Sequence, residues 1–171
     1  MVSHMNIAAV ENVVREIAER LSRIALVVAP PVLRIALAIP FFRSGLTKWD
    51  GFLILSPAAA YLFEDEFKLH IFGNAYDFPL PLVVAYLDGI AEIVLPFLLV
   101  AGLATRFSAL MLLIMTGVIQ LVVPEGWANF HLPWAALAIA IIALGPGRLS
   151  LDYFATCVLA PNGGTPGAFH R

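Results

Sequence analysis

The sequence predicts an all-α fold: an integral membrane four-helix bundle with a short interfacial element between the first and second spans. Three observations lead to this prediction. Of the 171 residues, 61% are hydrophobic and 13% are charged, whereas an ordinary soluble domain has about 45–50% apolar and about 25% charged residues. The mean hydropathy is +0.90. The apolar residues also gather into four long runs, so lipid is the expected surrounding of most of the chain.

The first two predicted spans are residues 24–46 and residues 79–103. The first is interrupted by a Pro-Pro pair and two arginines, yet at about 1.5 Å per residue it can cross a hydrocarbon core of about 30 Å. The second begins at a proline, which suits the first turn of a helix because the N–H group there needs no intrahelical partner. We expect the second span to be the longest.

The third predicted span is residues 107–123, so close to the second that the two are expected to form a tight helical hairpin. The fourth, residues 130–144, is short for a span and ends at a Gly-Pro-Gly sequence, which stops a helix. Between the first and second spans, residues 57–69 combine apolar and acidic side chains. This stretch is the predicted interfacial element.

Flanking the spans, residues 1–23 are predicted to be a cytoplasmic amphipathic segment, and residues 155–171 a disordered tail rich in glycine and proline. With the N-terminus inside, the cytoplasmic segments carry only arginines as basic residues, and the outer loops carry two lysines. They are Arg15, Arg20, Arg23, Arg106, Arg148 and Arg171 inside, and Lys48 and Lys68 outside. This is a positive-inside bias, so both termini are expected in the cytoplasm and the protein in a bacterial cytoplasmic (inner) membrane.

Four ionisable side chains fall within the first two spans. Each costs at least about 2.5–3.5 kcal/mol at bilayer depth, so it is expected to face the bundle interior and find a partner. Asp88 and Glu92 are four residues apart and therefore share one helical face. Counting along the two spans places Arg34 level with Glu92, and Arg43 level with Asp88. Two interhelical ion pairs are predicted from these depths.

These charges have two open interpretations: structural pairs that specify helix packing, or the lining of a polar pocket that opens outward. Convergence with polar residues of the other spans and of the outer loop favours the pocket. The predicted pocket residues are Arg34, Arg43, Lys48, Asp88, Glu92, Gln120 and His131. Its aromatic walls are expected from Phe41, Phe42, Tyr86 and Trp134.

The motifs of common enzymes are missing from this sequence. It has no Walker loop, no nucleophile elbow, no nucleotide-cofactor fingerprint and no His pair at metal-binding spacing. The single cysteine, Cys157, excludes an intrachain disulfide and a C-x-x-C redox pair. Catalytic residues therefore stay unknown, no metal site is predicted, and catalysis by this chain alone is not expected. The net charge of −2 gives no basic field for nucleic acid.

Several short motifs occur in an order that is similar to one family. They are Arg34 with Phe41-Phe42-Arg43-Ser44-Gly45 and Lys48, the Tyr-Leu-Phe-Glu-Asp-Glu-Phe loop, the E-x-x-x-P run from Glu92 to Thr105-Arg106, Met115 to Gln120, His131-Leu-x-Trp134, and Gly145 to Asp152. Together they resemble the DoxX family of small bacterial membrane proteins. The resemblance implies a four-helix membrane domain, residues 24–154 here. It also implies association with membrane oxidoreductase systems, including quinone-linked thiosulfate oxidation.

The leading hypothesis is an accessory or ligand-binding membrane subunit of a quinone-linked redox system. In it the outward-facing pocket binds a quinone or a small anion through hydrogen bonds, and no cofactor is intrinsic to the chain. Alternatives are a small-molecule or ion transporter, a permeability factor, or a scaffold for partner proteins. The expected partners are the bilayer, other subunits of a redox complex and further copies of this chain. Small residues such as Gly89 and Ala109 would permit such close helix packing.

Overall fold

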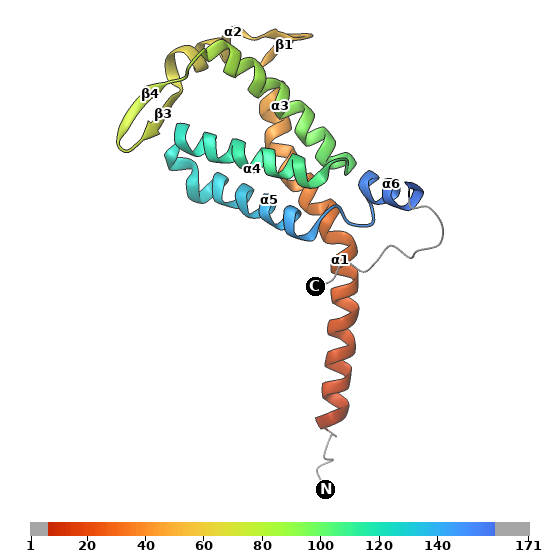
Figure 1. The fold of residues 1–171 in the computed structure, drawn as a ribbon. Coiled ribbons are helices and arrows are strands. Elements are labelled where there is room, and N and C mark those ends of the chain that lie inside the picture. The colour runs from red at the N-terminus through yellow and green to blue at the C-terminus, as the bar shows by residue number, and fades with distance from the viewer. Residues whose placement is uncertain (1–6, 160–171) are drawn as a thin grey trace.

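The computed structural model describes residues 7–159, which include four helical segments long and apolar enough to cross a membrane (Figure 1). They are Val10–Leu46, Pro81–Ala101, Thr105–Val122 and Pro124–Leu144. Each of the four predicted runs corresponds to one of these segments. The predicted all-α membrane bundle is therefore confirmed, and the exposed apolar side chains of the spans contact the lipid bilayer.

The elements follow one another along the chain as three groups. The first group is α1 (Ile7–Leu46), a hairpin of β1 (Trp49–Gly51) and β2 (Ile54–Leu55), α2 (Pro57–Tyr61) and the π-helical turn η1 (Leu62–Glu66). The second is an antiparallel hairpin of β3 (Lys68–Ile71) and β4 (Asn74–Asp77), then α3 (Pro81–Ala101) and α4 (Thr105–Val122). The third is η2 (Pro124–Gly126), η3 (Trp127–His131), α5 (Leu132–Leu144) and α6 (Leu151–Leu159). The predicted interfacial element is thus α2 with η1, continued by the start of β3.

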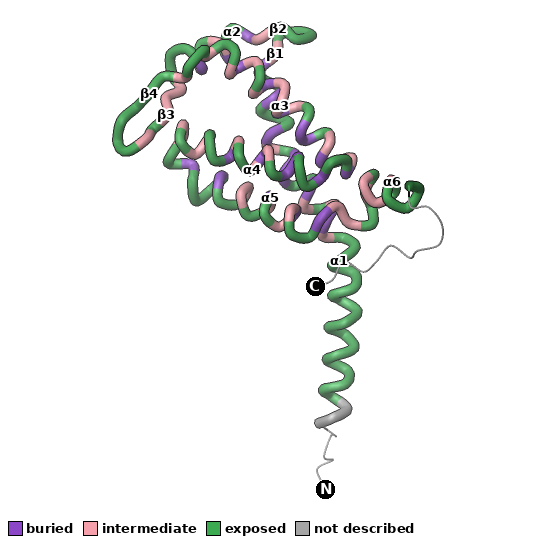
Figure 2. Tube along the Cα trace, viewed as in Figure 1, coloured by how far each residue is buried: buried purple, intermediate pink, exposed green. Residues whose placement is uncertain are grey.

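The first helix is much longer than one span and remains continuous through Pro30, Pro31 and Pro40. Prolines are tolerated in membrane helices because neighbouring groups satisfy the backbone carbonyls that they release. Residues 10–28 are exposed and project from the bundle (Figure 2). The segment predicted as residues 1–23 is thus the first part of α1 from Ile7 onward. Of the predicted tail, α6 includes residues up to Leu159, and residues 160–171 lie outside the described chain.

The apolar core lies between the four spans, and each span contributes two of its eight buried residues. These are Leu37 and Phe41 from α1, Leu95 and Leu99 from α3, Ala109 and Leu112 from α4, and Ala138 and Ile141 from α5. The two strand pairs and α2 lie together at one end of the bundle, which we call the hairpin end, and α6 lies at the other (Figure 1). The core therefore separates two ends with different polar contacts.

The contact between α1 and α3 is close because a glycine lies in it. A Cβ atom at Gly45 would lie 2.9 Å from the Cβ atom of Glu92 and 3.0 Å from its backbone carbonyl carbon. One turn toward the start of α3, Gly89 leaves room for Trp49, whose ring would be 2.7 Å from an added Cβ atom. The missing side chains let the two segments approach, as small residues do in membrane helix packing.

At the α6 end, hydrogen bonds join four segments. The Arg34 guanidinium donates to the backbone oxygen of Leu149 at 2.5 Å. The Asp152 carboxylate accepts from the backbone N–H groups of Ala104 (2.8 Å) and Thr105 (2.9 Å), and so caps α4 from another helix. Burial by itself would raise the pKa of Asp152, but these hydrogen bonds together with the Arg34 charge hold that pKa below its ordinary value.

The close contact at Gly45 predicts a cost for one added methyl group. Gly45→Ala is expected to lower the free energy of unfolding by about 1–3 kcal/mol, because the backbone of α3 at Glu92 must move away. Gly117→Ala in α4 is the matched control, since nothing lies within 4 Å of its added Cβ atom, and alanine favours a helix over glycine. Thermal unfolding of both variants in one detergent measures the difference. An unchanged melting temperature for Gly45→Ala would contradict this packing.

Candidate functional site

A cavity of about 450 Å³ lies at the hairpin end of the bundle. Its lining comes from α1 and the turn after it, α2, η1, α3, α4 and α5, together with two phenylalanines on either side of the β3–β4 hairpin. The aromatic part of the lining is Phe41, Phe63, Phe67, Phe78 and Trp134, and the polar part is Ser44, Thr47, Lys48, Asp88 and Glu92. The cavity therefore combines apolar walls with one polar cluster.

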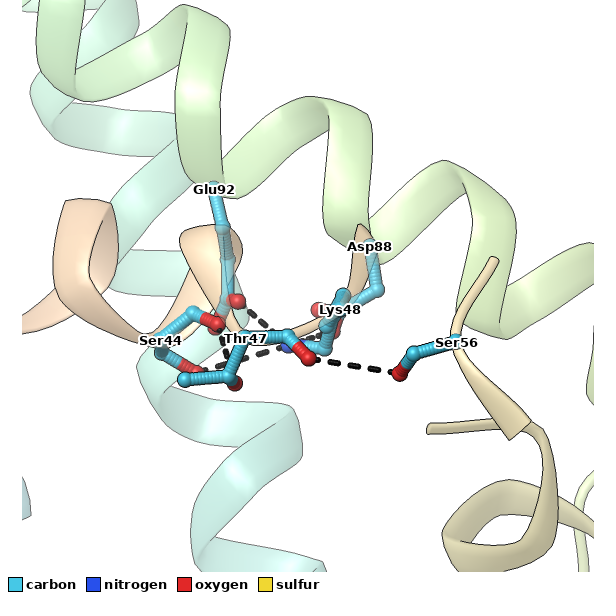
Figure 3. A network of polar contacts seen from close by, with 6 residues as sticks. All are labelled: Ser44, Thr47, Lys48, Ser56, Asp88 and Glu92. Carbon is cyan, nitrogen blue, oxygen red and sulfur yellow. Dashed lines mark hydrogen bonds and ion pairs between the residues drawn. The ribbon is translucent and has the colours of Figure 1, made fainter. Parts of the chain in front are cut away.

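The polar cluster is centred on a buried ammonium group (Figure 3). Lys48 Nζ lies 2.7 Å from Asp88 Oδ2 and also forms an ion pair with Glu92 Oε2. It donates a longer hydrogen bond, 3.4 Å, to Ser44 Oγ. The Glu92 side chain is only 4% exposed and that of Asp88 is 22% exposed. Since burial removes these charges from water, each of them depends on the others for its solvation.

Local structure explains why Lys48 meets these acids. Asp88 and Glu92 share one face of α3, which the close contact at Gly45 brings against the end of α1. The backbone N–H of Lys48 then closes the last turn on the oxygen of Gly45 at 3.2 Å, and its own carbonyl accepts from Ser56 N at 2.8 Å. Ser56 also caps α2, through Ala59 N at 3.2 Å. A hydrogen bond thus connects the start of the interfacial segment, at Ser56, directly to Lys48.

The cluster has one excess acid. With all groups ionised, one ammonium faces two carboxylates, so its formal charge is −1. Like charges close together in a poorly solvated site are unfavourable, and a hydrogen-bond donor or a cation near the carboxylates relieves that repulsion. The arrangement can therefore bind a ligand whose polar head meets the carboxylates and whose apolar body contacts the aromatic walls.

Three of the seven predicted pocket residues line the cavity together, namely Lys48, Asp88 and Glu92. Gln120 and His131 do converge with each other: the Gln120 oxygen lies 2.7 Å from His131 Nδ1. This pair lies outside the cavity lining, next to Trp134, whose ring centroid is 5.5 Å from that of His131. The Gln120–His131 pair therefore contacts Trp134, a residue of the cavity wall, and does not line the cavity itself.

The two predicted ion pairs, Arg34 with Glu92 and Arg43 with Asp88, are wrong. Lys48 pairs with both acids, while Arg34 is 2% exposed at the opposite end of the bundle. Arg43 is exposed, and being two residues from Gly45 it lies on the opposite side of α1 from α3.

The reason for this error is a relative shift of the two helices. Gly45, eleven residues after Arg34, is the residue level with Glu92, so the count along the spans was wrong by about three helical turns. It assumed that the spans begin and end at the same level. Instead, the first turns of α3 extend beyond the end of α1 and contact the β1–β2 hairpin, where Tyr86 donates to the Leu53 oxygen at 3.1 Å.

The aromatic walls were predicted in part. Phe41 and Trp134 line the cavity and pack on each other with ring centroids 5.3 Å apart. Phe42 is 40% exposed, and Tyr86 packs on Trp49 at 5.2 Å instead. Among the polar and aromatic residues of the lining, sequence reasoning missed Ser44, Thr47, Phe63, Phe67 and Phe78. The i, i+4 spacing of Phe63 and Phe67 on the apolar face of the interfacial element was the signal available for two of them.

Metal ligands do not cluster in the part of the chain that the structure describes. Within residues 7–159, no group of three or more His, Cys, Asp or Glu side chains is placed to hold a metal ion. Asp88 and Glu92 instead share Lys48 as their cation. The side chains of this site can form hydrogen bonds and ion pairs with a ligand.

Replacing Lys48 tests whether the ion cluster stabilises the fold. Lys48→Met is expected to lower the free energy of unfolding by about 3–5 kcal/mol, because the buried Glu92 carboxylate and the half-buried Asp88 carboxylate lose their counterion. Lys68→Met is the control, since its partner Asp77 is 79% exposed, and a surface pair contributes about 0–1 kcal/mol. Adding Asp88→Asn and Glu92→Gln to Lys48→Met should restore part of the stability. Equal melting temperatures for the two lysine variants would refute the cluster's structural role.

Comparison with known proteins places this fold and site in a family. The DoxX family profile matches residues 29–125, a range that includes Lys48, Asp88, Glu92 and the interfacial segment. A Haemophilus influenzae protein named "Uncharacterized protein" is 32% identical over an alignment of 140 positions, which covers 71% of this chain and 79% of that relative. No solved structure matches the chain. By this profile match and this relative, the chain belongs to the DoxX family.

Proposed function

We propose that this protein is a ligand-binding accessory subunit of a quinone-linked redox system in the membrane, and that the cavity at the hairpin end binds the quinone ring. The observation that carries the proposal is an aromatic cavity with a buried ion cluster as its only strongly polar part. DoxX family membership agrees with a redox association. A partner subunit would supply the redox centre.

The size and chemistry of the cavity fit a substituted ring. About 450 Å³ lies within the range of about 300–1,000 Å³ typical of small-molecule sites. Phe63 packs edge-to-face on Phe67 with centroids 5.2 Å apart, and further aromatic rings prefer offset or edge contacts of this kind. Asp88 and Glu92 at one side of the cavity would orient the polar atoms of the ring. An apolar tail would leave toward the lipid that surrounds the spans.

We also propose that the hairpin end faces outward from the cytoplasmic membrane of a bacterium and that both termini are cytoplasmic. The arginines of α1 before Pro30, and those around the α3–α4 and α5–α6 turns, lie on the α6 side of the bundle. Clustered arginines favour the cytoplasmic side. The bacterial source of the relative supports the assignment to a bacterial membrane. The cavity would then be reached from the outer leaflet.

Co-purification tests the proposed ligand. The protein extracted in mild detergent is expected to carry a quinone that native mass spectrometry and organic extraction identify. Glu92→Gln should lose most of it, because the amide cannot hold Lys48 at the cavity wall as the carboxylate does, while Lys48 and Asp88 remain a balanced pair. Glu64→Gln, an exposed acid of η1 that is outside the cavity lining, should retain it.

The melting temperature of both variants must be measured alongside, so that loss of quinone is not loss of fold. Equal quinone content in the two variants would remove the cavity as the binding site. A stoichiometric protein partner with no small molecule in the wild-type preparation would replace this proposal with the scaffold function.

The single, exposed Cys157 of α6 gives a direct test of the orientation. A membrane-impermeant maleimide is expected to label Cys157 only after the cells are permeabilised. The control is Asn74→Cys on a Cys157→Ser background, because Asn74 is exposed in the β3–β4 hairpin, and this cysteine should react in intact cells. The reverse labelling pattern would invert the proposed topology.

A further inference from the structure

Hydrogen-bond donors are scarce in the polar cluster of the cavity. A lysine ammonium has three donors and no acceptor. The three groups in contact with Lys48 Nζ are Ser44 Oγ, Asp88 Oδ2 and Glu92 Oε2, and all lie close around it (Figure 3). The three donors of Lys48 are therefore directed at the protein itself, and none remains for a ligand.

The two hydroxyl groups beside Lys48 are also engaged. Thr47 Oγ1 donates to the backbone oxygen of Ser44 at 2.7 Å, and the Ser44 hydroxyl, which accepts from Lys48 Nζ, has the Glu92 carboxylate as a neighbouring acceptor. Among the lining side chains, the indole N–H of Trp134 is a further donor, and it belongs to the aromatic wall. A ligand that approaches the ion cluster therefore meets hydrogen-bond acceptors and not free donors.

Asp88 presents the most accessible of these acceptors. An ionised carboxylate has two oxygens and about four lone-pair positions, and the ion pair with Lys48 uses Oδ2 of Asp88. Oδ1 is left to accept another hydrogen bond. The Asp88 side chain is 22% exposed, against 4% for Glu92, so Asp88 is the acid that a molecule in the cavity reaches first.

This acceptor surface distinguishes the two redox forms of a quinone. The oxidised ring carries two carbonyl oxygens, which are acceptors with partial negative charge. The reduced ring, with two more electrons and two more protons, carries two hydroxyl donors. A carbonyl facing Asp88 meets like charge and leaves both groups without a hydrogen bond, which is costly in a buried site. A hydroxyl facing Asp88 forms a charge-assisted hydrogen bond.

We infer that the cavity binds the hydroquinone form of its ligand in preference to the quinone, with a ring hydroxyl donating to the Asp88 carboxylate. This inference rests on the proposed function, because it specifies the redox form that the same cavity takes. It concerns binding alone and requires no electron transfer within this chain. As a subunit of a redox system, the protein would hold the reduced ring.

The test compares one ring in its two redox states. Tetramethyl-1,4-benzoquinone and its hydroquinone are bound separately to the purified full-length protein in detergent, by equilibrium dialysis without oxygen. The hydroquinone is expected to bind at least about tenfold more tightly, the ratio that one hydrogen bond to a charged group provides.

Variants at Asp88 test whether the ratio of hydroquinone to quinone affinity depends on the Asp88 carboxylate. Asp88→Asn replaces an acceptor oxygen by an amide N–H₂ donor and leaves Lys48 balanced by Glu92, so the ratio should fall toward one. Asp88→Glu keeps the carboxylate and should keep the preference. Asp77→Asn is the control, because Asp77 lies in β4 outside the cavity lining, and its ratio should equal that of the wild type.

Three results would overturn the inference, and they are distinguishable. If the quinone binds as tightly as the hydroquinone, or more tightly, the preference is refuted while the proposed quinone site stands. If neither form binds to the folded wild-type protein, the proposed function fails and the inference fails with it. A tenfold preference that persists in a folded Asp88→Asn variant would refute the role of Asp88.

Discussion

The buried ion cluster of Lys48 with Asp88 and Glu92 is the interaction on which the arrangement of the hairpin end depends. It joins the end of α1 to the middle of α3, and through the backbone of Lys48 it holds Ser56 at the start of α2. Buried charges require partners, because one charge left unpaired destabilises the fold by more than the complete ion pair stabilises it. The cluster therefore sets how far α1 and α3 slide along each other, and Gly45 allows the approach that the pairing needs.

The cavity follows from that shift of the two helices. Since α3 begins well beyond the end of α1, its first turns are covered by loop segments in place of another span. The β1–β2 hairpin contacts Tyr86 and packs Trp49 on Gly89, and η1 brings Phe63 against Phe67 and Phe78. Aromatic rings supplied by a loop leave a space between them and the spans. The polar cluster lies at the edge of that space, which is why one cavity has both apolar and charged walls.

The α6 end is tied by a different means. There Arg34 donates to the Leu149 oxygen and Asp152 caps α4 across the turn between α3 and α4. These are contacts from charged side chains to backbone groups at helix ends, where unpaired N–H and C=O groups need partners. They hold the connection of α5 to α6 against the bundle. The apolar core between the two ends leaves the charge cluster isolated from this second polar site.

The sequence by itself determined the class of the fold, the number and order of the spans and the interfacial element, because long apolar runs and the need to satisfy backbone groups in lipid leave few alternatives. It also grouped Lys48, Asp88 and Glu92 in one predicted pocket, the two acids because they share a helical face and Lys48 because it lies close by in the sequence. The pairing was decided only by the tertiary structure. Arg34 in α1 and Lys48 in the turn after α1 are both buried basic residues, and from the sequence either could meet an acid of α3. The axial shift between the helices, which the ion cluster fixes and the close packing at Gly45 permits, places Lys48 beside the acids and Arg34 beside the backbone of the other end.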